Sequence, residues 1–534
     1  MSERRPPGSL GPRILRDTLH VTFASAAAQV VIFAAAAYIA AVFGATWQTD
    51  AFYLAFTLPL FAANVVREAI KAVFVPVLVE IKVKTPEQVG PVVSSALFAV
   101  TVIACAAGLV LMAAVPWALP RVAPQLSPAG SRLAVRLVWE LMPILPLMCL
   151  AGVLSGLLNA YQHFRLPMLA PGLEAALKAG AVFVLVRPMG IHSLALGNVL
   201  GSLASTVALW LWARSLRLPA GALPRLPAGA LPRLHPGLTR MGQLALFPLL
   251  GNTLLLLNPF VDRTVATQLP AGAITALNYA ERINSLPYVL VGAGLFSVIL
   301  SHWSQMVAEE GPGQLGRALQ EGLLTLAYVL APVTAIFVVL RTPLVRLVLE
   351  RGRFDAAATS LTALALGYLA LGTIPSYAGT LLARGYLVLQ DTRTPVLLGL
   401  LNAGLNLALD LALVGALGLG GIGLSTSLTL LIIAALSLAL IRRRLPGPDW
   451  LPLLWPGLRI VLAGLATALV THYAYLAAAG VLGDRTFLSL AAAVALAGLA
   501  GLAVFVASSL ALGLQEPLKL LHWLGPQRAR RETA

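Results

Sequence analysis

Long apolar segments follow one another along almost the whole chain of 534 residues, and they decide what it can fold into. A helix needs about 20 mainly apolar residues to cross the hydrocarbon layer of a membrane. In lipid, only helices or closed barrels satisfy the backbone, and these segments lack the period-two alternation of barrel strands. We therefore predict an all-α polytopic membrane protein with about 14 transmembrane helices, near residues 19–43, 51–78, 90–114, 133–160, 167–186, 191–213, 240–266, 272–300, 319–340, 359–389, 395–415, 421–441, 458–479 and 486–513.

The composition excludes several classes of protein. Hydrophobic residues make up 59% of the chain and charged residues 11%, against about 45–50% and about 25% in soluble proteins. A soluble enzyme and a nucleic-acid-binding protein are therefore excluded, although the formal net charge is +16. No zinc-protease, serine-hydrolase or phosphate-loop motif assembles a nucleophile with a base. We expect that the chain is not an enzyme.

The positions of the basic residues predict the topology. Arg4, Arg5, Arg13 and Arg16 precede the first span, and cytoplasmic segments carry the excess of Lys and Arg. Alternation of sides from there predicts that both termini are cytoplasmic. Four arginines after the ninth span fall on the outer side, where LVRLVLERGRF reads as a short amphipathic segment at the membrane interface.

A proline-rich segment and an internal repeat divide the chain. The tandem octapeptide LPAGALPR lies within residues 214–239, and its prolines predict a semi-rigid linker. LLNAYQHFRLP resembles LLARGYLVLQDTRTP if extra residues are allowed in the second segment, and an offset of 228 relates Arg165 to Arg393, Pro167 to Pro395, Gly44 to Gly272 and Pro59 to Pro287. The repeat predicts two six-helix lobes in parallel orientation, a transporter plan. The predicted parts are an N-lobe (1–213), the linker, a C-lobe (240–441), two additional spans (442–513) and a basic cytoplasmic tail (514–534).

Charged side chains inside the predicted spans are the first candidates for function, because they are costly in lipid. Arg67 and Lys71 lie in the second span, and Glu281 and Arg282 lie in the eighth. Together the cations would suit the anionic headgroup of a lipid, since arginine binds phosphate through its fork and lysine as a point charge. The alternative is that these residues lie closer to a membrane interface.

A polar stripe marks the eleventh span, where Asn402, Asn406 and Asp410 follow at intervals of four residues. Oxygen-bearing side chains in a dry bundle suit a hard cation, and Thr429 and Asp262 offer further oxygens. The alternative is hydrogen bonding between helices, which asparagine commonly provides in membranes.

Several longer motifs resemble those of the MurJ/MviN family of lipid II flippases. They are FGATWQTDAFYLAFTLP (Phe43–Pro59), NAYQHFRLPMLAP (Asn159–Pro171), VDRTVA (Val261–Ala266), LNYAERINSLP (Leu277–Pro287), LERGRFDAAAT (Leu349–Thr359) and QDTRTPV (Gln390–Val396). The resemblance implies fourteen helices and translocation of the undecaprenyl-pyrophosphate-linked peptidoglycan precursor. It implies that Asp50 is the acidic residue of a TDAF motif, that Arg282 faces the headgroup, and that Asp262, Asn406, Asp410 and Thr429 hold sodium.

The chain also departs from the family pattern. Gln29 and Ala35 in the first span, and Ala63 and Asn64 in the second, stand where family members usually carry arginines. Two alternatives stay open for this reason: a flippase for another lipid-linked oligosaccharide, and a cation-coupled small-molecule antiporter of the same superfamily. The expected partners are the lipid-linked glycan, the bilayer and a cell-envelope synthesis complex, with no nucleic acid.

Overall fold

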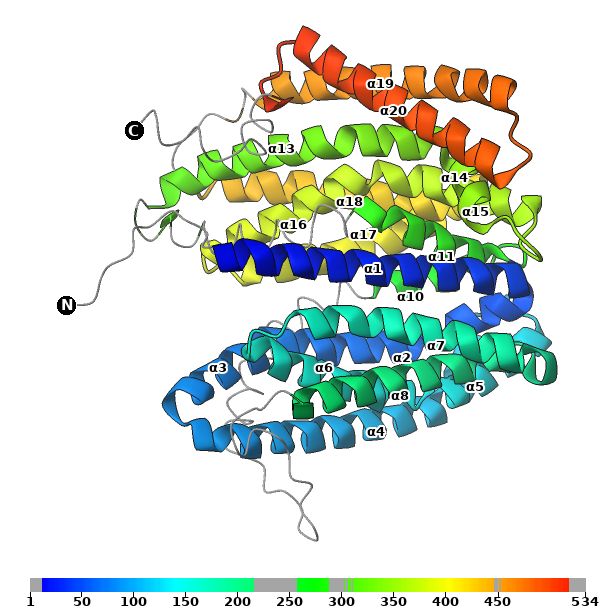
Figure 1. The fold of residues 1–534 in the computed structure, drawn as a ribbon, viewed down its shortest axis with the longest axis vertical. Helices are drawn as coiled ribbons and strands as arrows, with labels where there is room; N and C mark the ends of the chain where they lie inside the picture. The colour runs from blue at the N-terminus through cyan, green and yellow to red at the C-terminus, as the bar shows by residue number, and fades with distance from the viewer. Residues whose placement is uncertain are drawn as a thin grey trace. The chain divides into compact units, whose positions relative to one another are not determined.

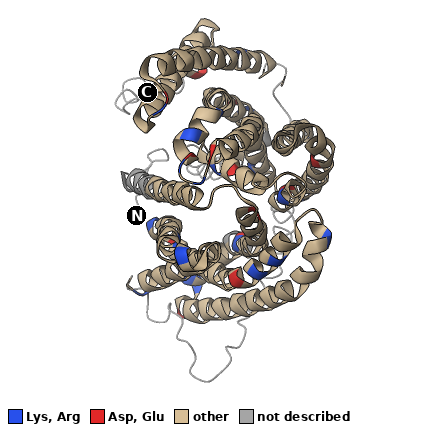
Figure 2. Cartoon of the chain, turned by 90° about the vertical axis from the view of Figure 1, so that its right-hand side faces the viewer, with Lys and Arg blue, Asp and Glu red and all other residues tan. Residues whose placement is uncertain are grey.

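The computed structural model describes residues 12–215, 257–287, 303, 306–307, 309, 311–445, 450 and 453–517. Every regular element among these residues is helical, as predicted, and charged residues are sparse on the helices (Figure 2). The linker after residue 215, the start of the seventh predicted span, the end of the eighth and most of the tail lie outside the described residues.

Two compact units divide the chain. The first comprises Met1–Thr275 together with Arg351–Phe354, and the second comprises Ala276–Glu350 and Asp355–Ala534. The long helices of each unit run side by side (Figure 1). The first unit contains α1 (Pro12–Phe43), α2 (Trp47–Ala69), α3 (Val75–Lys84), α4 (Val89–Val122), α5 (Pro128–Leu141), α6 (Ile144–Ala160), α7 (Arg165–Met189), α8 (His192–Ser215) and α10 (Asn258–Ala266).

The second unit begins within α11 (Ala273–Asn284). It continues with α13 (Pro312–Val339), α14 (Arg341–Leu349), α15 (Ala356–Leu371), α16 (Thr373–Val388), α17 (Arg393–Leu417), α18 (Leu419–Arg442), α19 (Leu454–Leu482) and α20 (Phe487–Ala511). The first part of the segment predicted to lie at the membrane interface belongs to α14. Within this helix, Arg346 forms an ion pair with Asp484 of the α19–α20 loop at 2.7 Å.

Eleven helices among the described residues are long and apolar enough to cross a membrane, or twelve if the bent pair α15–α16 counts as one span. These twelve correspond to the first six and the last six predicted spans. The predicted total of 14 stays a prediction, because the seventh and eighth spans run into residues that the structure does not describe. The polar second span is broken: α2 passes into a π-helical turn (Ile70–Phe74) before α3.

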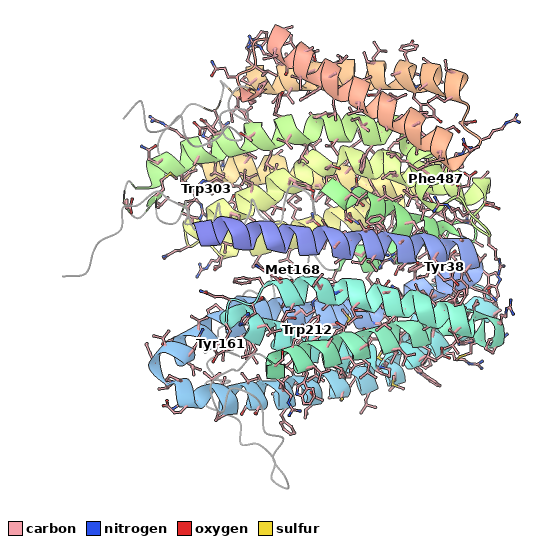
Figure 3. All side chains as sticks on the ribbon, viewed as in Figure 1. Tyr38, Tyr161, Met168, Trp212, Trp303 and Phe487 are labelled. Carbon is pink, nitrogen blue, oxygen red and sulfur yellow. The ribbon has the colours of Figure 1, made fainter. Side chains whose placement is uncertain are left out.

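Close helix packing in the first unit depends on small residues and a few polar bonds. A Cβ on Gly197 of α8 would lie 3.0 Å from the carbonyl oxygen of Lys178 on α7. A Cβ on Gly201 would lie 2.6 Å from the carbonyl oxygen of Glu174. The hydroxyl of Ser202 donates to Glu174 at 3.0 Å. Tyr38 lies on α1 (Figure 3), and its ring is 6.4 Å from the ring of Phe183 on α7. α1 and α8 thus both pack against α7.

The internal repeat recurs in the backbone. α7 spans Arg165–Met189 and α17 spans Arg393–Leu417, so both ends differ by the same offset that the sequence showed. Left-handed residues repeat in pairs at this offset, with φ of 66° and 97° at Gly44 and Gly272, 63° and 57° at Gln162 and Gln390, and 54° and 56° at Gly190 and Gly418. The insertion that the sequence comparison assumed in the second segment is therefore wrong, because the loops before α7 and α17 align without one.

Candidate functional site

Asp50 caps a helix that begins much further along the chain. It sits in the first turn of α2, where Thr46 and Thr49 form a capping box, and its side chain is 5% exposed. Its carboxylate accepts hydrogen bonds from the backbone N–H of Gly272 (2.6 Å), the N–H of Thr275 (2.8 Å) and the hydroxyl of Thr275 (2.7 Å). A carboxylate at a helix N-terminus satisfies free N–H groups and complements the helix dipole. Asp50 thereby ties the start of α11 to α2.

Three glycines let backbone segments meet beside Asp50. Gly44, Gly272 and Gly352 all have positive φ. A Cβ on Gly44 would overlap the carbonyl oxygen of Arg353, one on Gly352 would overlap that of Ala41, and one on Gly272 would lie 2.7 Å from that of Ala45. The N–H of Arg353 donates to the carbonyl of Ala41 at 2.7 Å. We call residues 41–46, 272–275 and 351–354 the glycine junction.

The buried cation Arg263 forms a second connection between α2 and α10. Its Nη1 donates to the hydroxyl of Thr57 at 2.8 Å, and the two residues are 6% and 4% exposed. The Thr57 hydroxyl in turn donates to the carbonyl of Tyr53 at 2.7 Å. In the sequence, Arg263 appears only as part of the VDRTVA motif of the seventh predicted span. Its partner lies on a helix far away in the sequence and carries no sequence signal.

The predicted headgroup residues occupy two different settings. Arg67 lies in the last turn of α2 and is half-buried; Gly152 on α6 leaves space for it, since a Cβ there would lie 3.2 Å from its Cγ. Lys71 lies on the π-helical turn that follows, a type of distortion often found at functional sites. Glu281 and Arg282 belong to the last turn of α11.

The exposed face of α11 is polar. Most of its residues are buried, whereas Asn278, Glu281, Arg282 and Ser285 just beyond it are at least partly exposed. These positions follow at helical spacing and therefore share one face. Asn284 anchors the helix end within the second unit by donating to the carbonyl of Leu369 at 3.4 Å. A charged stripe on a helix that is otherwise buried in apolar surroundings is typical of a wall of a water-filled cavity.

The predicted cation ligands are buried on α17 and α18. Asn402, Asn406 and Asp410 form the buried stripe that the sequence predicted, and Asn406 and Asp410 are 0% exposed. Asn406 Nδ2 donates to Asp410 Oδ2 at 3.1 Å, and the Ser425 hydroxyl donates to the carbonyl of Asn406 at 3.0 Å. The Thr429 hydroxyl on α18 is buried and has no hydrogen-bond partner among the described residues.

Asp262 is also buried, at 4% exposure, and belongs to α10 in the first unit. Within the described part of the chain, no three His, Cys, Asp or Glu side chains gather as a metal cluster would require. Any cation site would therefore depend on amide, hydroxyl and single carboxylate oxygens, the ligand chemistry of a hard cation.

The fold and the site define the class of the chain: a multi-pass α-helical membrane protein of transporter architecture. The model of the family described as "Lipid II flippase MurJ" matches residues 39–490. The chain therefore belongs to the MurJ family, whose members are lipid II flippases of the bacterial inner membrane.

Two relatives from other bacteria extend this result. The lipid II flippase MurJ of Burkholderia cenocepacia is 28% identical over 371 residues, which is 67% of this chain and 70% of the relative. The probable lipid II flippase MurJ of Synechocystis sp. is 26% identical over 420 residues, 77% of this chain and 78% of the relative.

Solved structures share the fold. A lipid II flippase MurJ in an inward closed conformation matches with a TM-score of 0.75 and 21% identity, covering 93% of this chain and 98% of that one. An inward-facing multidrug resistance MATE family transporter of the MOP superfamily matches with a TM-score of 0.64 and 14% identity, covering 79% and 98%. At these identities the likeness concerns the fold alone.

Proposed function

We propose that the chain translocates lipid II, the polyprenyl-pyrophosphate-linked peptidoglycan precursor, across the cytoplasmic membrane by alternating access. Translocation requires no covalent chemistry, so the chain acts as a transporter and not as an enzyme. Family membership over residues 39–490 supports this assignment. The proposal also places both termini in the cytoplasm, following the distribution of basic residues.

The observation that carries the proposal is the architecture of α11. Its half-exposed face carries Arg282 and Glu281, while Asp50 fixes its first turn. Arginine binds phosphate oxygens in a bidentate fashion, so Arg282 is the proposed contact for the pyrophosphate. Arg67 and Lys71 add positive charge in the first unit, and Glu281 limits the net charge around Arg282.

In the proposed topology, the glycine junction is the outer gate in its closed state. α1 leaves the cytoplasmic side, so its end at Phe43 and the start of α2 face outward. The close backbone contacts leave no room for a substrate there. Opening toward the outside requires the three hydrogen bonds of Asp50 to break, and we propose that this is how Asp50 controls access.

We propose that Asn406, Asp410 and Thr429, all in the second unit, bind a sodium ion that resets the transporter. Full burial and an oxygen-only donor set on α17 and α18 fit a hard cation. The hydroxyl of Ser425 donates to the backbone carbonyl of Asn406, which links α18 to α17 beside these donors. The bound ion would supply positive charge that neutralises the buried carboxylate of Asp410.

A second candidate substrate is another polyprenyl-pyrophosphate-linked glycan. Ala63 is fully buried in a cluster with Ala104, Leu145 and Cys149, and Ala35 is 5% exposed. An arginine side chain does not fit in these packed positions. The chain therefore binds its headgroup with a different set of cations from that usual in the family, and a different sugar is compatible with such a change.

Complementation tests the assignment. A bacterium depleted of its own lipid II flippase should grow when it expresses this chain and should lyse when it expresses Arg282→Ala. Arg187→Ala is the matched control, because Arg187 is exposed at the end of α7, and it should support growth. Lysis with a well-expressed wild-type chain would remove lipid II as the substrate and favour the second candidate.

A further inference from the structure

Thr57, the partner of Arg263 on α10, lies in line with Asp50 along α2. Thr57 follows Asp50 by two helical turns, which places both on one face, about 10 Å apart. Each of them holds a segment that lies more than 200 residues further along the chain: Asp50 holds the first turn of α11, and Thr57 holds α10 through Arg263. Leu54, between them on the same face, is 2% exposed.

An apolar pocket lies beside the contact between Thr57 and Arg263. This open pocket of about 390 Å³ is lined by apolar side chains that include Leu58 and Phe61 of α2, Val110 and Leu111 of α4, and Phe260 of α10. Every lining side chain is apolar. Because nothing in this lining can hydrogen-bond, the bond between Arg263 and Thr57 supplies a polar link between α10 and α2 that the lining itself cannot supply.

The bond is also well built for a latch that opens and closes. The hydroxyl of Thr57 donates to Tyr53 and accepts from Arg263, so both of its hydrogen-bonding roles are filled. A hydrogen bond from a charged donor contributes more to stability than one between neutral groups. The hydrogen bond is not covalent, so it can break and form again without a chemical change in either side chain.

We propose that Thr57 and Arg263 are positioning residues that form a second latch of the outer gate. They hold α10 against α2 when Asp50 caps α11, and outward opening requires both contacts to break. The proposal rests on the proposed function of the glycine junction as the outer gate. It assigns Arg263 a role in gating and none in binding the headgroup.

The test is the accessibility of a cysteine placed between the two contacts. The native residues Cys105 and Cys149 are changed to alanine, and Leu54→Cys provides the reporter. A membrane-impermeant maleimide is then added from the outer side. In this background, Thr57→Val removes the acceptor at nearly constant volume, and Thr57→Ser keeps it. We expect Thr57→Val to label about 10-fold faster, as loss of a charged hydrogen bond predicts, and Thr57→Ser to label at the parent rate.

Arg263→Met and Arg263→Lys repeat the comparison from the other partner, with faster labelling expected for Met and an intermediate rate for Lys. If Thr57→Val accumulates poorly, Thr57→Ala tests the same acceptor. Equal labelling of Thr57→Val and Thr57→Ser would overturn the latch. The assay uses no transported substrate, so it succeeds or fails independently of whether the chain flips lipid II.

Discussion

At the scale of single residues, the buried carboxylate of Asp50 predicts an effect on the proposed gate. Asp50→Asn keeps the shape of the side chain and removes its charge, so it weakens the cap on α11 and the hydrogen bonds that Asp50 accepts. We expect roughly 10-fold slower transport, corresponding to about 1.4 kcal/mol. Transport by purified protein in vesicles measures this effect. An Asp50→Asn variant as fast as the wild type would remove Asp50 from the gate.

The glycine junction predicts a backbone-specific effect. Gly352→Ala places a Cβ against the carbonyl oxygen of Ala41 on a left-handed backbone, and the conformation alone costs about 1–2 kcal/mol. We expect a lower melting temperature and slower transport. Gly180→Ala is the control, because a Cβ at Gly180 on α7 meets nothing within 4 Å. If both variants had the same melting temperature, the tight contact at Gly352 would not contribute to stability.

The residues of the site differ in how far the sequence predicted them. The stripe of Asn402, Asn406 and Asp410 follows from helical spacing, and the structure confirms its burial. The contact between Arg263 and Thr57 did not follow, because it joins side chains on helices that are far apart in the sequence. Local periodicity describes one helix face, whereas the choice of partner depends on how distant helices pack.

At the scale of elements, the paired turns before α7 and α17 contain an unusual residue. Gln162 and Gln390 have φ of 63° and 57°, a conformation that glycine adopts without the steric cost of a Cβ. Gln162→Gly and Gln390→Gly should each raise stability by about 0.5–1 kcal/mol, measured by thermal unfolding in detergent. Valine at the same positions should lower it. Destabilisation by glycine would mean that the glutamine side chains contribute more than the backbone strain.

The contact between α14 and the α19–α20 loop predicts a pH dependence. The hydrogen bond and charge of Arg346 lower the pKa of Asp484 below its usual range. This contribution to stability is therefore present above about pH 3.9, the unfolded value, and is lost as pH falls through the lower folded pKa. Asp484→Asn should lower the melting temperature slightly at pH 7, and the difference should shrink toward pH 3. A difference that is independent of pH would contradict the pairing.

Helix positions were predicted more completely than helix shape. Twelve of the predicted spans have counterparts among the described helices, because apolar length alone decides that a segment crosses the membrane. The π-helical turn after α2 and the 43° bend between α15 and α16 were not predicted. Such distortions depend on tertiary packing, which no single window of sequence reports.

At the scale of the whole molecule, a repeated arrangement of helices surrounds a few charged residues. The repeat recurs in helix ends and left-handed turns, and charged residues are few on the helices (Figure 2). Within this apolar background, Asp50 and Arg282 stand at opposite ends of α11. The central claim is that this arrangement moves a lipid-linked pyrophosphate across the bilayer.

The most direct test is lipid II translocation by the purified chain in liposomes. Fluorescent lipid II is placed in both leaflets, and its exposure to an impermeant enzyme that modifies the headgroup is followed over time. With the wild-type chain we expect rapid conversion of nearly all lipid II. With Arg282→Ala we expect conversion of only the lipid II in the outer leaflet. Conversion by the wild-type chain no faster than in protein-free liposomes, or equal conversion by Arg282→Ala, would contradict the central claim.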